Sequence, residues 1–459
     1  MTPARPLTKT SPKANSLYRE WRKLAKRQGE RVAVQVCARN KSFSFNKLAS
    51  LAETHPAPEI LRPGLPLAPV PAAGLDFLLG VLAAWREGLA VLPLEPGTHP
   101  PAAWLDPATE LPPLPANCAI VKLTSGSTGA PRGVAFTEPQ VAADALQLVL
   151  MMSMHRQSPN IGGISLAHSY GFSNLVTPLL LHGIPLIFSE SALPAALHDA
   201  LSVRGPWSSF TLPAVPALWS AWLRADVFSK HALMPVQGIS AGAPLPLELE
   251  QQALDTADLP IRNFYGASEC GGIAYYLGIR PRETQSLAGT VIPGVGVSVT
   301  EEGLLQVRGP AVGETYWPEP GPNLADGVYT SSDLVELREN GELHLLGRAG
   351  EMIHIAGRKL MPQEVEKALR GHSLVEECLV FGIPSRDSTR QEEIVACVRI
   401  LGREAGEDEL RAYLHGHLPG WKIPRHWWIT EELQVDVRGK LSRDGWRKRF
   451  LHAFPDGTG

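Results

Sequence analysis

Residues 124–133 constrain the fold of this chain more than any other segment. They follow a short apolar run at residues 119–121 that has the character of a strand, and they contain three glycines, four hydroxyl side chains and the cation of Arg132. Glycine lets a backbone turn tightly and approach a ligand closely. Successive N–H groups and hydroxyls then form a concave, donor-rich cradle for an anion. The segment therefore predicts a phosphate-binding loop at the end of a strand.

Two other kinds of loop have a related composition. Ser, Thr and Gly also dominate ordinary solvated turns, so composition alone leaves a surface loop possible. The common P-loop is excluded, because it needs a Lys-Ser/Thr pair five residues after the first glycine. The residue five positions after Gly126 is Pro131.

The composition describes a globular chain with more than one domain. Its 459 residues exceed what one hydrophobic core usually supports, and 44% are hydrophobic. The net charge of −3 argues against a nucleic-acid binder. The five cysteines are odd in number and form no CxxC pair, which favours reduced thiols and a cytoplasmic location. The N-terminus lacks the apolar core of a signal peptide, and the run at 176–188 is too interrupted to span a bilayer.

The pattern along the chain predicts an α/β fold followed by a smaller unit. Residues 1–15 are expected to form a disordered basic arm. Apolar spacing predicts a helix at 16–27, and strand, crossover helix and strand then recur, as in an α/β core. Short strands with turns follow residue 285, and 352–459 has the pattern of a compact α+β domain. The expected organisation is a domain at 16–347, a hinge at 348–351 and a C-terminal domain at 352–459.

Several segments in a fixed order resemble one family. They are residues 124–133, 165–171, 238–245, 263–269, 329–333, 347–350, 353–364 and 438–443. Together they resemble the signature motifs of the adenylate-forming superfamily, which includes acyl- and aryl-CoA synthetases, peptide-synthetase adenylation domains and luciferases. The resemblance implies a large N-terminal domain of several subdomains and a small, mobile C-terminal domain. Each segment alone is a moderate or weak signal, and the resemblance depends on their common order.

The resemblance implies a set of contacts to ATP. The loop would hold the β- and γ-phosphates, and a Gly/Ala run would let adenine lie against the backbone. An aromatic side chain would contact the base, and a carboxylate would accept hydrogen bonds from the ribose hydroxyls. The cofactor-binding residues expected on this basis are Thr124, Ser125, Gly126, Ser127, Thr128, Gly129, Arg132, Gly242, Ala243, Pro244, Asn263, Phe264, Tyr265, Gly266, Asp333 and Arg348.

The resemblance also implies catalytic groups. Lys440 would bridge carboxylate and phosphate, Ser268 would bond the α-phosphate, and His168 would lie beside the acyl site. Glu269 would hold Mg²⁺, for which one carboxylate is sufficient because the ion also takes phosphate oxygens and water. A core histidine and a solvated Gly-Lys turn are the respective alternatives for His168 and Lys440. The residues expected to bind the acid are His168, Tyr170, Phe172, Ser240, Gly271, Gly272 and Ile273.

The chain departs from the family pattern at four places. Arg132 replaces the usual lysine, which keeps the charge but gives it a planar fork. Gly350 occupies the hinge position where Asp or Lys is usual, and Gln434 replaces the proline that usually opens the last motif. The stretch between Leu94 and the loop is much shorter than in the family. We expect a trimmed first subdomain, with more effect on packing than on chemistry.

The implied activity is ATP-dependent adenylation of a carboxylic acid to acyl-AMP and pyrophosphate, followed by thioester formation with CoA. The alternatives are transfer to the phosphopantetheine of a carrier protein, adenylation without thioesterification, and a non-catalytic nucleotide-binding scaffold. Residues 208–216 contain no acidic residue that would pair with an amino group. An aryl or fatty acid is therefore expected over an amino acid. No nucleic-acid or membrane-spanning role is expected, and the oligomeric state stays open.

Overall fold

The computed structural model describes residues 14–37, 40–124, 132–189, 191–228, 234–386, 390–400, 406–431, 433 and 442–454. Contacts between residues divide the chain into two compact units. The first comprises Met1–Ser298, Gln306–Ser331 and Leu337–His344, and the second comprises Val299–Leu305, Ser332–Glu336 and Leu345–Gly459. This division falls at different residues from the boundaries expected at 347 and 352, so those boundaries stay a prediction.

A largely parallel sheet forms the centre of the first unit. Its strand order is β11-β10-β9-β7-β8-β1, all parallel, with β2 antiparallel at one end and β12 and β13 antiparallel beyond β11. The strands are β1 Val32–Val36, β2 Lys41–Ser44, β7 Asn160–Gly162, β8 Leu186–Phe188, β9 Phe210–Ala214, β10 Val236–Ser240, β11 Ile261–Ala267, β12 Gly271–Tyr275 and β13 Leu287–Val291.

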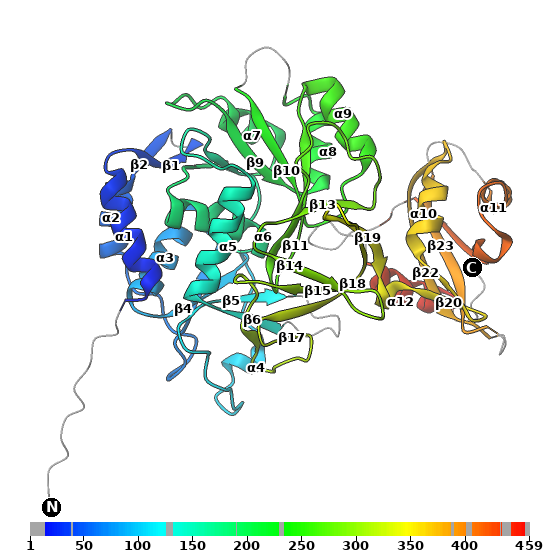
Figure 1. Cartoon of the computed structure of the whole chain (residues 1–459), viewed down its shortest axis with the longest axis horizontal. Helices are drawn as coiled ribbons and strands as arrows, with labels where there is room; N and C mark the ends of the chain where they lie inside the picture. Colours follow the sequence, from blue (N-terminus) through cyan, green and yellow to red (C-terminus); the bar gives the residue numbers. More distant parts are fainter. Residues whose placement is uncertain are drawn as a thin grey trace, which may run out of the picture. The chain divides into compact units, whose positions relative to one another are not determined.

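Helices cover both faces of this sheet. One face packs against α7 (Pro194–Leu201), α8 (Pro216–Arg224) and α9 (Leu247–Ala257), through a buried cluster that includes Phe210 and Trp219 (Figure 1). The other face packs against α5 (Glu138–Met151), through a cluster that includes Leu148 and Phe264. Parallel strands buried on both faces are the expected arrangement for an α/β fold. The α/β prediction is confirmed.

The second sheet of the first unit carries the strand that leads into the predicted phosphate loop. Its order is β16-β6-β5-β4-β3, with β3, β4 and β5 parallel and β6 and β16 antiparallel. The elements are β3 Leu67–Pro71, β4 Ala90–Leu94, β5 Cys118–Thr124, β6 Arg132–Thr137, β16 Thr315–Trp317, α3 Gly74–Arg86 and α4 Ala102–Leu105. The strand expected at 119–121 is therefore present, within β5.

The N-terminal helices show why the first helix begins where it does. In α1 (Ser16–Gln28), Leu17, Trp21 and Leu24 form the buried stripe that their spacing predicted, and α1 packs on α2 (Phe45–Thr54). Asn15 caps the helix: its side chain accepts from the Tyr18 N–H, and its own N–H donates to the Trp85 carbonyl. The arm expected at 1–15 is thus ordered at Asn15, and residues 1–13 lie outside the described part.

The run at 176–188 takes an unusual form. It follows α6 (Ser169–Gly171) as two short π-helices, Phe172–Val176 and Pro178–His182, and ends in β8. Among the described residues, no helix is both long and apolar enough to cross a bilayer. None of the five cysteines, all of which lie in the described part of the chain, forms a disulfide there, and Cys270, Cys378 and Cys397 are buried.

Between residues 296 and 348 the chain is assigned in turn to the first and the second unit, and this part contains several strands. Their bounds are β14 Gly296–Val299, β15 Leu304–Arg308, β17 Leu324–Ala325, β18 Val328–Leu337 and β19 Glu342–Arg348. The change to short strands expected after residue 285 is therefore present. The 3₁₀ turn Ala349–Glu351 follows β19.

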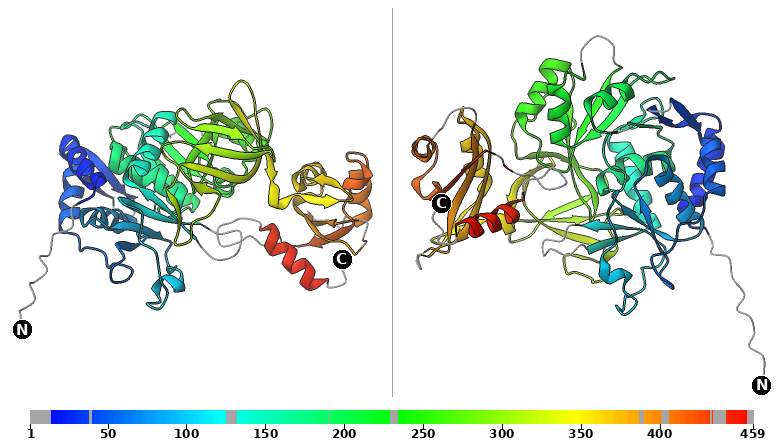
Figure 2. Two further views of the ribbon diagram at one scale, coloured as in Figure 1. Left: turned by 60° about the horizontal axis from the view of Figure 1, so that its bottom comes forward. Right: turned by 180° about the vertical axis from the view of Figure 1, so that it is seen from behind.

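The second unit has the α+β character that its sequence pattern predicted. Its sheet has the order β22-β23-β24, and β20 and β21 form a separate hairpin. Alternate residues of β22 face two cores: Val380 packs with α10 and α11, and Phe381 packs with α12. Figure 2 shows α11 in orange and α12 in red on different sides of this sheet. The elements are β20 Ile353–Ile355, β21 Arg358–Leu360, α10 Pro362–Arg370, β22 Val375–Pro384, β23 Glu392–Ile400, α11 Glu407–His415, a 3₁₀ turn Gly420–Lys422, β24 His426–Thr430 and α12 Arg443–Ala453.

Candidate active site

The predicted motifs of the first unit gather at the carboxyl ends of its strands. Ser240 ends β10 and is the register partner of Asn263 in β11, while Ala214 at the end of β9 is the other partner of Ser240. Open α/β sheets bind ligands beside the carboxyl ends of their parallel strands. The fold therefore brings the 238–245 and 263–269 motifs to neighbouring strands at the edge where a ligand is expected.

The predicted phosphate loop connects two paired strands. Thr124 ends β5 and pairs with Arg132 at the start of β6, and the Thr124 hydroxyl donates to the Arg132 carbonyl at 3.3 Å. This pairing sets the two ends of the loop side by side. The predicted phosphate contacts between these ends, namely Ser125, Gly126, Ser127, Thr128 and Gly129, lie outside the described residues.

Arg132 and Glu269 meet on one tyrosine. The Arg132 guanidinium lies 4.4 Å from the centroid of the Tyr316 ring, within cation–π range. The Tyr316 hydroxyl donates to Glu269 Oε1 at 3.1 Å, and it accepts from Asn323 Nδ2 at 3.1 Å. The predicted phosphate cation and the predicted metal carboxylate are thus held by the same side chain.

Burial raises the pKa of Tyr316, and the negative charge of Glu269 raises it further. Its hydroxyl therefore stays protonated at neutral pH and remains a hydrogen-bond donor to Glu269. A protonated hydroxyl orients the carboxylate without adding a charge to the site.

A tight hairpin presents Ser268 and Glu269. The residue pairs Ala267–Gly271 and Gly266–Gly272 join β11 to β12, and the strands bulge between Tyr265 and Gly266. An added Cβ at Gly266 would lie 2.4 Å from the Gly271 carbonyl oxygen, so glycine is required for this approach. The Glu269 carbonyl also accepts from the Gly313 N–H at 2.8 Å. The turn that carries the predicted metal ligand is therefore held on both sides.

The predicted acid-binding residues differ in exposure. His168 is exposed and is the N-cap of α6, and its carbonyl accepts from the N–H of Phe172, which follows that helix. Tyr170 donates to the Ile239 carbonyl at 3.2 Å, and burial raises its pKa well above the usual value. Phe172 is 1% exposed and packs edge-on against Phe77. Its ring lies in the core, so a direct contact with an acid would require it to be uncovered.

The other predicted site residues near the sheet edge likewise include both buried and exposed side chains. Ser240 is fully buried, and its hydroxyl finds no hydrogen-bond partner among the described residues. Phe264 is 7% exposed and lies 6.0 Å from the Tyr170 ring, so it is a core residue here. Asn263 donates to the Ala288 carbonyl at 2.8 Å. By contrast Tyr265, Gly266, Gly242, Ala243, Pro244 and Gly271 are partly or fully exposed, while Gly272 and Ile273 are buried.

The second unit contains the ribose-motif carboxylate and the hinge arginine. The Arg348 Nε donates to Asp333 Oδ1 at 3.0 Å. Arg348 is largely exposed and Asp333 only slightly so. The pair is close enough to act on one ligand. Lys440 lies outside the described residues, as does Gln434.

The described residues contain no group of three or more His, Cys, Asp or Glu side chains that could hold a metal ion. A single carboxylate is compatible with Mg²⁺ delivered together with nucleotide phosphates, because Mg²⁺ retains water and needs few protein ligands. Glu269 is the residue that would hold the ion.

Sequence reasoning missed three residues at this site. Tyr316 and Asn323 come from a region without a recognisable motif, and only the pairing of β16 with β6 brings Tyr316 to the loop. Lys122 is buried, and its amine donates to Ser173 Oγ at 3.2 Å. A lysine inside an apolar strand was a usable signal, because a charged side chain is almost never fully buried without a partner.

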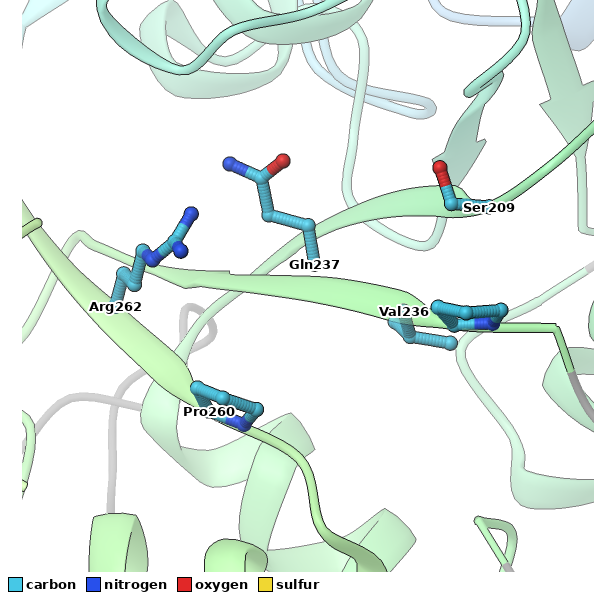
Figure 3. Close-up of a pocket in the computed structure, with 6 residues that line it drawn as sticks. Ser209, Val236, Gln237, Pro260 and Arg262 are labelled. Carbon is cyan, nitrogen blue, oxygen red and sulfur yellow. The ribbon is translucent and has the colours of Figure 1, made fainter. Parts of the chain in front are cut away.

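A cavity of about 190 Å³ lies elsewhere, lined by Ser209, Pro235, Val236, Gln237, Pro260 and Arg262. Figure 3 shows the Gln237 and Arg262 side chains projecting from the same side of their strands. The lining residues lie at the amino ends of β9, β10 and β11, at the edge opposite the predicted site. Gln237 donates to the Met152 carbonyl and to the Tyr275 hydroxyl. We therefore assign no part of the ATP site to this cavity.

The fold and the gathered motifs define a nucleotide-binding α/β protein with a small α+β C-terminal unit. Two family models agree: one for AMP-binding enzymes matches residues 98–317, and one for the C-terminal domain of AMP-binding enzymes matches residues 364–440. The chain belongs to the adenylate-forming superfamily.

Individual relatives are distant. The chain is 28% identical to a feruloyl-CoA synthase from Amycolatopsis over 374 residues, which covers 76% of this chain and 74% of the relative. It is 25% identical to a long-chain-fatty-acid–CoA ligase from Bacillus subtilis, covering 71% of this chain and 60% of that protein. Its fold is similar to that of ATP-bound MatB from Rhodopseudomonas palustris, with a TM-score of 0.82, 20% identity and coverage of 96% and 100% of the two chains.

Proposed function

We propose that the chain is an AMP-forming ligase that activates a carboxylic acid with ATP and then joins the acyl group to CoA. The observation that carries the proposal is the grouping of Arg132, Tyr316 and Glu269. Arg132 stacks on the Tyr316 ring and Glu269 accepts from the Tyr316 hydroxyl, which supports a joint role of the two charges in binding Mg²⁺ and phosphate. Membership of the superfamily and the CoA-ligase relatives support the same activity.

In the first step the carboxylate of the acid attacks the α-phosphorus of ATP, and pyrophosphate leaves. A carboxylate is a weak nucleophile, so catalysis depends on positioning and on neutralising the phosphate charge. Arg132 and the loop donors would hold the β- and γ-phosphates, and Ser268 would donate to the α-phosphate. Lys440 would bridge the α-phosphate and the attacking carboxylate. Mg²⁺, when bound at Glu269, would supply further positive charge between the phosphates.

Asp333 and Arg348 would bind the nucleotide sugar. Asp333 can accept two hydrogen bonds from the vicinal ribose hydroxyls, and Arg348 would lie near the ribose and phosphate. Their ion pair holds both side chains ready in the second unit. The exposed Gly242, Ala243 and Pro244 segment and Tyr265 would receive the adenine ring.

In the second step a thiol attacks the mixed anhydride, and AMP leaves. We propose that the C-terminal domain rotates about residues 348–351 between the two steps. The rotation would move Lys440 away from the nucleotide and bring the 353–364 segment to it for the reaction with the thiol. CoA is the proposed acceptor, as in the relatives. The phosphopantetheine of a carrier protein presents the same thiol and is the second candidate.

The acid is proposed to be an aryl or fatty acid. Gly271 and Gly272 add no side chain of their own next to Glu269, and the partly exposed Tyr170 ring offers a flat apolar surface. No acidic residue occurs in 208–216 to pair with an amino group. His168, Ser240 and Ile273 complete the proposed acid-binding set, together with Phe172 if its ring is uncovered.

A pyrophosphate-release screen tests the function. The full chain is incubated with ATP and Mg²⁺ and with aryl, fatty, dicarboxylic and amino acids, each with and without CoA. We expect release with at least one aryl or fatty acid and formation of its CoA thioester. Release without a thioester indicates an adenylating enzyme that uses another acceptor. No release or ATP–pyrophosphate exchange with any acid would contradict the proposal and favour a nucleotide-binding scaffold.

A further inference from the structure

Lys122 is a buried cation beside the proposed site. It lies in β5, two residues before Thr124, and its side chain points into the interior with 5% of its surface exposed. Its amine donates to Ser173 Oγ at 3.2 Å and lies 4.7 Å from the centroid of the Phe136 ring. A buried ammonium is costly unless it is paired, and an apolar residue would fill the same strand position without that cost.

A hydroxyl connects Lys122 to a buried carboxylate. Ser173 Oγ accepts from Lys122 and donates to Asp144 Oδ2 at 2.5 Å. Asp144 is also 5% exposed and lies in α5, whereas Ser173 lies in the π-helical segment that follows the His168 motif. Such π-helical turns are frequent at functional sites. The three residues, which we call the Lys122 network, therefore join three elements of the first unit.

The Lys122 network touches the hairpin that carries Glu269. An added Cβ at Gly271 would lie 2.2 Å from Asp144 Oδ1, so this carboxylate oxygen packs directly on the Gly271 backbone. Gly271 has a φ of +71°, a conformation that glycine adopts readily. Asp144 Oδ1 has no hydrogen-bond partner among the described residues. The carboxylate is thus held by Ser173 on one side and faces the hairpin on the other.

The charges around Lys122 also link it to Asp144 and Glu269. Burial lowers the pKa of the Lys122 amine, while the charges of Asp144 and Glu269 act to raise it. Lys122 therefore interacts with both carboxylates through a medium that contains little water, where charges interact more strongly than at the surface. The single cation of Lys122 thus lies within electrostatic range of two negative charges, those of Asp144 and Glu269.

We propose that Lys122, Ser173 and Asp144 form a positioning network that holds the Glu269–Gly271 hairpin at a fixed place relative to the strand leading into the phosphate loop. None of the three is proposed to touch ATP or the acid. The network acts through Glu269, whose carboxylate must meet the same phosphates that the loop binds. The inference rests on the proposed function, because it assigns Glu269 to Mg²⁺.

The test uses variants of the full chain. Ser173→Ala removes the bridging hydroxyl and keeps both charges. Lys122→Met removes the cation at similar volume, Lys122→Arg keeps it, and Lys122→Met with Asp144→Asn removes both charges. Lys47→Met, at an exposed lysine of α2, is the control. For each, the Mg²⁺ dependence of pyrophosphate release, the KM of the acid and the melting temperature are measured.

We expect Ser173→Ala and Lys122→Met to raise the Mg²⁺ concentration for half-maximal activity by about ten-fold, the scale of other lost supports of metal ligands. The KM of the acid should change by less than about two-fold, because the network does not contact it. Lys122→Arg should lie closer to wild type than Lys122→Met. A general loss of packing would not give this selective change.

Two results would overturn the inference: folded Ser173→Ala with wild-type Mg²⁺ dependence, or a change confined to the KM of the acid. If Lys122→Met does not fold, Ser173→Ala and the double variant decide. The Mg²⁺ dependence of the ATP-induced rise in melting temperature is measured alongside. If wild type binds Mg²⁺–ATP but releases no pyrophosphate with any acid, the proposed function fails, and this binding measurement still tests the network.

Discussion

The proposed role of Glu269 depends on its neighbours as much as on its own carboxylate. Its sequence motif indicated a metal ligand, but the structure adds the turn that presents it and the Tyr316 hydroxyl that orients it. Tyr316 in turn stacks on Arg132. Tyr316 therefore accounts for the arginine at the position where lysine is usual. A planar guanidinium can stack on the ring while it keeps donors for phosphate.

The first prediction concerns the charge of Glu269. Glu269→Gln keeps the size and hydrogen-bonding capacity of the side chain but removes the negative charge that would hold Mg²⁺. We expect the Mg²⁺ concentration for half-maximal pyrophosphate release to rise by at least about ten-fold. Glu283→Gln, at an exposed position, is the control. Unchanged metal dependence in a folded Glu269→Gln protein would remove Glu269 from the metal site.

The second prediction separates the two contacts of Tyr316. Tyr316→Phe loses the hydroxyl that donates to Glu269, a bond to a charged group worth about 1.5 kcal/mol, so we expect roughly a ten-fold loss in kcat/KM at limiting Mg²⁺. Tyr316→Leu also loses the ring under Arg132 and should additionally raise the KM of ATP. The measurement is steady-state pyrophosphate release at several Mg²⁺ and ATP concentrations. Equal effects of the two variants would contradict separate roles for hydroxyl and ring.

At the scale of elements, the turn Ala349–Glu351 is the best-defined candidate for a pivot. An added Cβ at Gly350 would meet nothing within 4 Å, whereas one at Gly347 would lie 2.0 Å from the Met361 side chain. Glu351, which follows Gly350, is held by Arg443, which donates to Glu351 at 2.6 Å and to Glu366 at 2.7 Å. Backbone freedom is therefore available at Gly350, between a restrained glycine and an anchored glutamate.

The third prediction follows from this contrast. Gly350→Ala should change the free energy of unfolding by less than about 0.5 kcal/mol, because the new methyl group meets no neighbour. It should slow thioester formation from preformed acyl-AMP, since alanine narrows the backbone rotation of a pivot, and leave adenylation near wild type. Single-turnover rates of the two steps measure this. Gly420→Ala, in another 3₁₀ turn where an added Cβ would make only an ordinary contact with His415 at 4.0 Å, is the control.

If Gly350→Ala leaves both rates unchanged, Gly350 is not the pivot. If it slows both steps equally, the substitution disturbs the domain rather than its motion.

At the scale of the whole molecule, the proposed reaction divides between the two units. Arg132 and Glu269 belong to the first unit, whereas Asp333, Arg348 and the last motif belong to the second. A ligase that uses one domain differently in two steps should show mutations that damage one step and spare the other. Such selectivity is a property of the whole chain and not of any single motif.

The fourth prediction applies this to Lys440. Lys440→Ala should lower the rate of adenylation by roughly 10²-fold or more, the cost of removing one charge-stabilising donor. It should spare the reaction of CoA with supplied acyl-AMP, because Lys440 is proposed to act in the first step alone. Lys448→Ala, at an exposed lysine of α12, is the control. Near wild-type adenylation by Lys440→Ala would refute its assignment.

The sequence alone determined the class of fold, the position of the first helix and the family. These follow from local information: apolar spacing places α1, and glycines with hydroxyls mark the loop at 124–133. The family motifs are likewise contiguous segments. Local patterns are readable because each depends on residues a few positions apart.

Only the tertiary structure decided which distant side chains share the site. Tyr316 reaches Arg132 because β16 pairs with β6, and Lys122 reaches Asp144 because β5 and α5 enclose Ser173. It also placed Phe172 and Phe264 in the core, where an aromatic side chain near a motif had suggested a ligand contact. Strand pairing and packing set these neighbours, and no spacing along the chain encodes them. The loop at 124–133 indicated a phosphate site, and the fold supplied the partners that support it.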